Sequence, residues 1–248
     1  MTPGLPGNPS LIVGDTSSLV QLVIVEDITA LRGLKQEYGI QVAVTEAVEA
    51  ELRRVVRNRF PAREAFLKKA FNSRTLAVVD KTLLNSLGYK AAPALLEQMD
   101  QLGEKFHRRV DRGEAYTHAA GNVLGVPTLS QDIAALWQLV KDGIDVQRPV
   151  LRAFDVLIFG VQARLAEIES CAKARRLLLK ARETILPCFE NCSVADGLPN
   201  FFLRLCDASL PPLGAEKKLE PFDDRIFVRK LSCPTPAESS HGAGSKEG

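Results

Sequence analysis

Long apolar runs and abundant cysteine are both missing from this sequence of 248 residues. No stretch of about 18 or more apolar residues occurs, so no segment is expected to span a membrane. The opening MTPGLPGNPS lacks the basic and apolar regions of a secretory signal. The five cysteines lie in the last third, and their odd number does not suggest a disulfide framework. We therefore expect a cytoplasmic protein that does not contact membranes.

An excess of charge of one sign is also absent. Lysine plus arginine number 32 against 30 acidic residues, which gives a formal net charge of +2. Nothing in this balance requires a nucleic-acid partner, and any basic binding surface must be local. The hydrophobic fraction of 46% and the chain length are sufficient for a sizeable buried core.

Short β-rich runs alternate with longer segments of helical period between residues 11 and 184. The expected strands are 11–14, 40–44, 75–79, 126–130 and 154–159. The expected helices are 17–37, 46–57, 92–109, 112–124, 133–141 and 161–184. This alternation predicts an α/β fold, a three-layer α/β/α arrangement with a central, mainly parallel sheet.

The two ends of the chain differ from this pattern. Residues 1–10 and 233–248 are rich in Pro, Gly and Ser and are expected to be disordered tails. The main domain is expected over 11–185. Residues 186–232 predict a helical or irregular C-terminal extension of unknown packing, with one strand at 225–229.

Two acidic residues follow expected strands directly. Asp15 comes after LIVG, and Asp132 comes after VPTLS with one residue between. Ligands of open parallel sheets bind at the carboxyl ends of the strands, so both residues are candidates for a site. The alternative is that each simply caps the helix that follows it.

Two glutamates could join these residues. On the segment 45–56, Glu51 and Glu49 flank the apolar stripe on opposite sides, and periodicity does not choose between them. Glu114 opens a helix lined with alanine that could lie close to the sheet, although Asp111 and Glu114 also have the spacing of a capping box. Four converging carboxylates would repel one another unless a divalent cation lay between them. Oxygen ligands favour Mg²⁺ or Mn²⁺ over zinc.

The order and spacing of four segments resemble the PIN-domain family of metal-dependent nucleases, which includes toxins of bacterial toxin–antitoxin pairs. The segments are LIVGDTSSL, VTEAVEAEL, DRGEAYTHAAGNVLGVP and TLSQDIAAL, spanning 11 to about 140. The resemblance assigns the metal-binding and catalytic acids to Asp15, Glu51, Glu114 and Asp132. It assigns supporting roles to Thr16, Ser17 and Ser130. It departs from the family near Gln131, where the family often has an acid or asparagine, and at Tyr116, where the family often has a second acid.

The resemblance implies hydrolysis of RNA phosphodiester bonds with Mg²⁺ or Mn²⁺ as cofactor. Its usual substrate is single-stranded or structured RNA, and an antitoxin or other protein partner and a homodimer are left open. Basic runs adjoin two of the acids, which suits a polyanionic substrate. The candidate nucleic-acid-binding residues are Arg53, Arg54, Arg57, Arg59, Arg108, Arg109 and Arg112. Their alternative is a solvated helix face.

Two further functions compete with a nuclease. One is a PIN-like scaffold, weak or inactive in catalysis, that binds RNA or protein. The other is a phosphatase of the haloacid dehalogenase type, which needs a second Asp at position 17, where this chain has Ser. His118 lies one turn after Glu114, and either contacts a phosphate or is an ordinary helical histidine, the simpler interpretation.

Overall fold

The computed structural model describes residues 11–144, 146, 150–162, 164–183, 185, 189 and 193–197. The expected tails, 1–10 and 233–248, lie outside these residues, as do the expected strand 225–229 and most of the expected extension 186–232. Within the described part, no helix is both long enough and apolar enough to cross a lipid bilayer.

A five-stranded parallel sheet forms the centre of the fold, with the strand order β3-β2-β1-β4-β5. The strands are β1 (Leu11–Gly14), β2 (Gln41–Val44), β3 (Leu76–Val78), β4 (Thr128–Leu129) and β5 (Val150–Leu151). Val13 pairs with Thr128, and Ile12 pairs with Val42, so β1 is the central strand. All four residues of β1 are buried because helices cover both faces of the sheet, which explains its apolar run.

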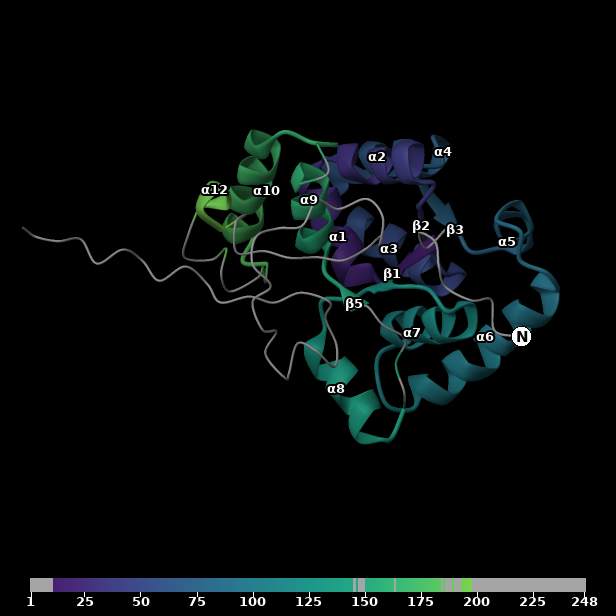
Figure 1. Cartoon of the computed structure of the whole chain (residues 1–248). Helices are drawn as coiled ribbons and strands as arrows, with labels where there is room; N and C mark the ends of the chain where they lie inside the picture. The colour runs from purple at the N-terminus through teal and green to yellow at the C-terminus, as the bar shows by residue number, and fades with distance from the viewer. Residues whose placement is uncertain are drawn as a thin grey trace, which may run out of the picture.

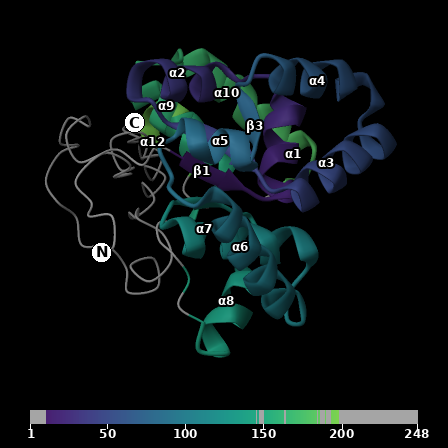
Figure 2. The same ribbon diagram turned by 90° about the vertical axis from the view of Figure 1, so that its right-hand side faces the viewer.

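Helices flank both faces of the sheet, as Figures 1 and 2 show from two directions. The first face is covered by α1 (Thr16–Val25), α2 (Thr29–Tyr38), α3 (Glu46–Arg59), α4 (Glu64–Asn72), α9 (Ala153–Gln162) and α10 (Ile168–Lys180). The second face is covered by α5 (Lys81–Ser86), α6 (Ala92–His107) and α7 (Arg112–Leu124). The remaining described helices are η1 (Pro61–Arg63), α8 (Ile133–Lys141) and α12 (Val194–Gly197). The expectation of an α/β fold with a parallel sheet is confirmed.

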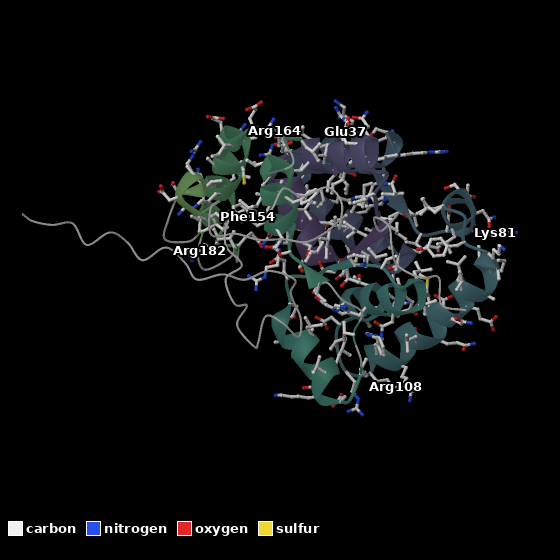
Figure 3. All side chains as sticks on the ribbon, in the orientation of Figure 1. Glu37, Lys81, Arg108, Phe154, Arg164 and Arg182 are labelled. Atoms are coloured by element: carbon white, nitrogen blue, oxygen red, sulfur yellow. The ribbon has the colours of Figure 1, made fainter. Side chains whose placement is uncertain are left out.

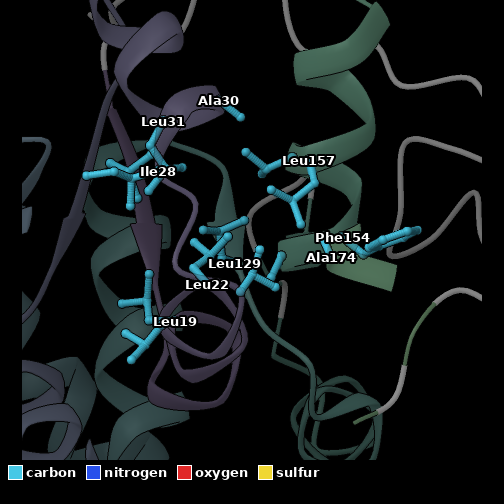
Figure 4. Close-up of a cluster of buried hydrophobic side chains, with 14 of the residues drawn as sticks. Leu19, Leu22, Ile28, Ala30, Leu31, Leu129, Phe154, Leu157 and Ala174 are labelled. Carbon is cyan, nitrogen blue, oxygen red and sulfur yellow. The ribbon is translucent and has the colours of Figure 1, made fainter. Parts of the chain in front are cut away.

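The side chains of β1 alternate between two apolar clusters. Ile12 and Leu129 belong to the cluster on the first face, whereas Val13 belongs to the cluster on the second. Figure 4 shows Leu129 beside Leu22 of α1 and near Leu157 of α9. The alternation fixes which strand residues face α7.

The expected strand at 154–159 is wrong, because this segment forms α9 instead. The last strand is the shorter β5, just before it. Every described side chain of α9 from 153 to 160 is buried. The helix therefore has no exposed polar face, and without one its sequence does not show a helical period. The expected single helix 17–37 is two helices, broken where Glu26 adopts a left-handed φ of 54°. Similarly, Arg164, with φ 59°, separates α9 from α10.

β1 lies between β2 and β4 in the sheet. From β1 the chain adds β2 and β3 on one side and then crosses to add β4 and β5 on the other, so the direction of strand addition reverses between β1 and β4. The carboxyl ends of two such strands leave a crevice where open α/β sheets bind ligands. Asp15 and Asp132 follow these two strands.

Candidate functional site

Asp15 lies fully buried at the carboxyl end of β1, where its backbone N–H donates to the carbonyl of Leu129 over 2.9 Å. Its Oδ1 accepts the backbone N–H of Ser18 at 2.7 Å, so it is indeed the N-cap of α1. Its Oδ2 accepts a hydrogen bond from the Ser17 hydroxyl at 2.9 Å. Burial raises the pKa of Asp15, and these hydrogen bonds only partly oppose the shift. Asp15 therefore caps α1, as the alternative interpretation expected, while its carboxylate lies at the carboxyl end of β1.

Asp132 is the N-cap of α8, and its Oδ1 accepts the backbone N–H of Ala135 at 2.9 Å. It is partly exposed, in contrast to Asp15. The preceding Ser130 is held to the neighbouring strand because its N–H donates to the carbonyl of Leu151 at 2.8 Å. The sheet thereby fixes the start of the loop that carries Asp132.

Glu51 points toward the start of α1. The Thr16 hydroxyl donates to Glu51 Oε2 over 2.8 Å. On the other side is Gly113 of α7, where an added Cβ would lie only 2.7 Å from the same oxygen. Glu49, in contrast, forms an ion pair with Arg53 at 2.7 Å. The structure thus places Glu51, and not Glu49, among the segments that carry the other acids.

Glu114, like Asp15, is a perturbed carboxyl. Its pKa is raised to about 7, first by burial and then by the negative charges of Asp15 and Asp132, with a smaller contribution from Asp111. Asp111 occupies the N-cap position of α7, but its side chain makes no capping hydrogen bond. The capping-box alternative for Glu114 is therefore wrong.

Small residues allow α7 to approach the sheet closely. Ala115, Ala119 and Ala120 are fully buried along the helix. The Thr117 hydroxyl donates to the carbonyl of Gly14, the last residue of β1, at 3.3 Å. This contact docks α7 directly beside Asp15, as the alanine-rich pattern predicted.

The chemistry of this donor set fits a hard divalent cation, because every proposed ligand offers carboxylate oxygen. A cation would also neutralise the charges of Asp15 and Asp132 that raise the pKa of Glu114. Among the described residues, however, no group of three His, Cys, Asp or Glu side chains is already spaced to hold a metal ion. The acids lie on segments that meet at the carboxyl end of the sheet, but their side chains are not already arranged as a set of metal ligands.

The basic residues near the site are partly engaged with acidic side chains. Arg54 lies 3.9 Å from Glu51, and Arg57 lies 3.7 Å from Glu64, with both arginines largely exposed. Arg109 pairs with Asp142 at 3.4 Å. Arg108 is exposed, and Figure 3 shows it on the outer side of the region formed by α6 and α8.

Three of the expected arginines stack on aromatic rings. Arg53 lies over Phe71, and Arg59 lies over Phe60, with guanidinium-to-centroid distances of 4.7 Å and 5.3 Å. Arg112 lies 5.3 Å from the centroid of Tyr116. Such stacking and pairing support the solvated-face alternative for part of the set, while Arg54, Arg57 and Arg108 are exposed to solvent.

The sequence did not predict a series of hydrogen bonds between polar side chains beside the candidate site. Gln131 donates to Gln21 Oε1 at 3.1 Å, and Gln21 Nε2 donates to Glu183 at 3.4 Å. These hydrogen bonds link the segment that carries Asp132 to α1 and to the residues that follow α10. The sequence contained one indication of it, because Gln21 is a lone polar residue in the apolar run LVQLVIV. In the structure Gln21 is almost fully buried.

Comparison with known proteins gives no match. No family model, no curated protein and no solved structure matches this chain. The PIN-domain resemblance therefore stays a prediction from the sequence.

Proposed function

We propose that this chain is a PIN-like, Mg²⁺- or Mn²⁺-dependent ribonuclease whose acids are Asp15, Glu51, Glu114 and Asp132. One observation carries the proposal: the charges of Asp15 and Asp132 help to raise the pKa of Glu114 to about 7. Perturbed carboxyls at the switch point of a parallel sheet are typical of functional sites. A cluster built only for stability would not place three acids where they repel one another.

Each group of residues would have its own role in this reaction. Asp15, Glu51, Glu114 and Asp132 would hold the cation, with Thr16 and Ser17 orienting Glu51 and Asp15 through their hydroxyl groups. The chemistry that Mg²⁺ or Mn²⁺ supplies when bound is polarisation of the scissile phosphate and activation of water. Arg54, Arg57 and Arg108, which are exposed, would contact the phosphates of a single-stranded or structured RNA.

The test is cleavage of a labelled RNA by the purified chain with Mn²⁺, with Mg²⁺ and with EDTA, beside a measurement of RNA binding. We expect cleavage with either metal and none with EDTA. We also expect Asp132→Asn to abolish cleavage while the protein stays folded, because asparagine is an equally good N-cap for α8. Cleavage that survives EDTA or this substitution would show that the activity does not come from this site.

A scaffold that binds RNA or protein without cutting is the second candidate. It is favoured by the lack of a preassembled group of three metal-ligating side chains in the described part of the chain. RNA binding without cleavage under any metal condition would support it. A role as a toxin, with an antitoxin partner, and a homodimer are predictions of the resemblance alone.

A further inference from the structure

Gln21 is a buried polar side chain in the middle of an apolar helix. It lies on α1, the helix that Asp15 caps, and its exposed fraction is 1%. The apolar side chains on either side of it along α1 belong to the buried core of the first face. Burying an amide side chain costs free energy unless its oxygen and nitrogen are hydrogen-bonded. The partners of Gln21 therefore indicate what this residue does.

The Gln21 amide joins the loop after β4 to the segment after α10. Its Oε1 accepts a hydrogen bond of 3.1 Å from Gln131 Nε2, and its Nε2 donates to Glu183 Oε2 at 3.4 Å. Gln131 and Glu183 lie 110 and 162 positions from Gln21 in the chain. These bonds therefore hold three distant segments together, with α1 in the middle.

The loop that carries Asp132 is held from three sides. The backbone N–H of Ser130 donates to β5, and the Asp132 carboxylate accepts the first turn of α8. Between these two residues, the side chain of Gln131 is bound to α1 through Gln21. Gln131 Oε1 is buried and has no hydrogen-bond partner among the described residues, so the bond from its nitrogen orients the amide.

The bond between Gln21 and Gln131 acts where the pairing of β1 with β4 has ended. The last ladder contact between these strands is the bond from the Asp15 N–H to the carbonyl of Leu129, the final residue of β4. Asp132 lies beyond this point, in a loop that the strands no longer fix. Because α1 begins at Asp15, a bond from α1 to the residue before Asp132 sets the distance between the elements that carry the two acids.

The segment after α10 is fixed by its own backbone. The N–H of Glu183 donates to the carbonyl of Leu178 at 2.9 Å, and Arg182 adopts a left-handed φ of 58° at the end of the helix. Since α10 packs against α1, this turn brings the Glu183 carboxylate to Gln21. Gln21 thus has a partner from a part of the chain that lies beyond the four segments resembling the PIN-domain family.

We propose that Gln21 is a positioning residue that holds the Asp132 loop against the start of α1, and that Glu183 holds Gln21 in the orientation this requires. The region after residue 140 thereby takes part in the candidate site. The effect on metal binding rests on the proposed function, because the distance between Asp15 and Asp132 matters to a cation only if both bind it. Groups that orient metal ligands typically contribute about 10- to 100-fold to metal affinity.

The experiment compares Gln21→Leu with Gln41→Leu in the full chain. Leucine is similar in size to glutamine but forms no side-chain hydrogen bond, and both glutamines are buried. Gln41 begins β2, at the opposite end of the strands from the acids, where its Nε2 donates to the carbonyls of Val42 and Thr75. The measurements are Mn²⁺ affinity, from free Mn²⁺ detected by electron paramagnetic resonance, and amide hydrogen exchange of residues 130–135 in EDTA.

We expect Gln21→Leu to weaken Mn²⁺ binding about tenfold, because the Asp132 loop loses its link to α1. Exchange of residues 130–135 should also become faster, since the loop opens more readily. Gln41→Leu should change neither quantity. Gln131→Leu and the double variant with Gln21→Leu should each lose about the same tenfold as Gln21→Leu, because all three remove one bond.

Glu183 offers a second test that does not alter the core, because its side chain is only half-buried. Glu183→Ala should weaken Mn²⁺ binding and speed exchange in the same direction as Gln21→Leu. Glu183→Gln keeps an oxygen that accepts the Gln21 N–H, so it should bind Mn²⁺ like the original chain. Equal Mn²⁺ affinity of Glu183→Ala and the original chain would overturn the role of Glu183.

The outcomes separate the positioning role from the proposed function. Unchanged exchange in Gln21→Leu would overturn the positioning role, and faster exchange with unchanged Mn²⁺ affinity would overturn its link to the metal site. A loss of about a hundredfold in the double variant would also overturn it, because the two glutamines would then act independently. An original chain that binds no Mn²⁺ would overturn the proposed function, and exchange of residues 130–135 would then decide alone whether Gln21 holds the loop.

Discussion

The Thr16 hydroxyl donates a hydrogen bond of 2.8 Å to Glu51 Oε2, joining the first residue of α1 to the second turn of α3. These residues lie 35 positions apart in the chain. The bond holds the Glu51 carboxylate at the carboxyl edge of the sheet, close to Gly113 of α7. It is the clearest sign that α1, α3 and α7 meet at one point.

Replacing Thr16 with valine removes this hydrogen bond while nearly preserving the shape of the side chain. We expect Mn²⁺ affinity to fall about tenfold because Glu51 loses its orientation. The free energy of unfolding should fall by about 1 kcal/mol. Calorimetric Mn²⁺ titration and urea unfolding measure the two effects. Thr16→Ser keeps the hydroxyl and should restore most of the affinity; a serine variant as weak as the valine variant would contradict the account.

Gly113→Ala tests how closely α7 approaches Glu51. The added Cβ would lie 2.7 Å from Glu51 Oε2, which is the end of a flexible side chain, so the carboxylate should move while the fold persists. We expect at least a tenfold loss of RNA cleavage with little change in circular dichroism. Gly103→Ala is the control, because its Cβ would press on the Tyr116 ring at 3.0 Å instead. Normal cleavage by Gly113→Ala would argue against a role for Glu51.

Glu114 should make the metal-free protein less stable as pH rises. Its pKa is about 7 in the folded chain against 4.5 as the ordinary value, so the folded state binds more protons between these two pH values. The free energy of unfolding contributed by this group therefore falls as pH increases from about 4.5 to about 7. In EDTA, Glu114→Gln should be about 1–2 kcal/mol more stable than the original chain at pH 8, after allowance for partial exposure. The two proteins should unfold alike near pH 4, and equal urea midpoints at both pH values would refute the shift.

Arg54 and Arg57 should contribute to RNA binding through charge alone. Their double replacement by glutamine should weaken binding to all RNA sequences similarly and reduce the slope of log affinity against log salt by about 1.4. Fluorescence anisotropy at several salt concentrations measures this slope. The matched control replaces Arg32 and Arg164 by glutamine, since both line a surface hollow between α2 and the turn after α9. Identical slopes for the two double variants would mean that α3 does not carry the RNA contact.

The sequence predicted the bounds of α7 and α8 as the structure has them, 112–124 and 133–141. Local signals explain this success, because Gly125 ends α7 with a φ of 66° and Asp132 caps α8. The identity of α9 could not be predicted in the same way. Its run FDVLIF is buried on every side, and only the tertiary contacts with α2 and α1 distinguish it from a strand.

The residues of the candidate site that follow strands could be predicted from the sequence. The residues whose place depends on contacts between distant segments could not. Asp15 and Asp132 were identified because they follow strands. The choice between Glu49 and Glu51 was not decided by periodicity, since both flank the same stripe, and the Thr16 bond that distinguishes them joins distant segments. The lack of a hydrogen-bond partner for the buried His118 ring among the described residues was equally invisible in the sequence, because partners of a buried side chain generally come from other segments.

If carboxylate charge at the end of β1 drives RNA cleavage, as we propose, then replacing Asp15 with asparagine should remove the activity. Asparagine still caps α1, so the variant should fold, and Asp80→Asn makes the same change at the N-cap of α5, outside the site. The measurement is the single-turnover cleavage rate of a labelled RNA at saturating Mn²⁺. We expect at least a hundredfold lower rate for Asp15→Asn and an unchanged rate for Asp80→Asn. Equal rates for Asp15→Asn and the original chain would show that this carboxylate charge is not needed for cleavage.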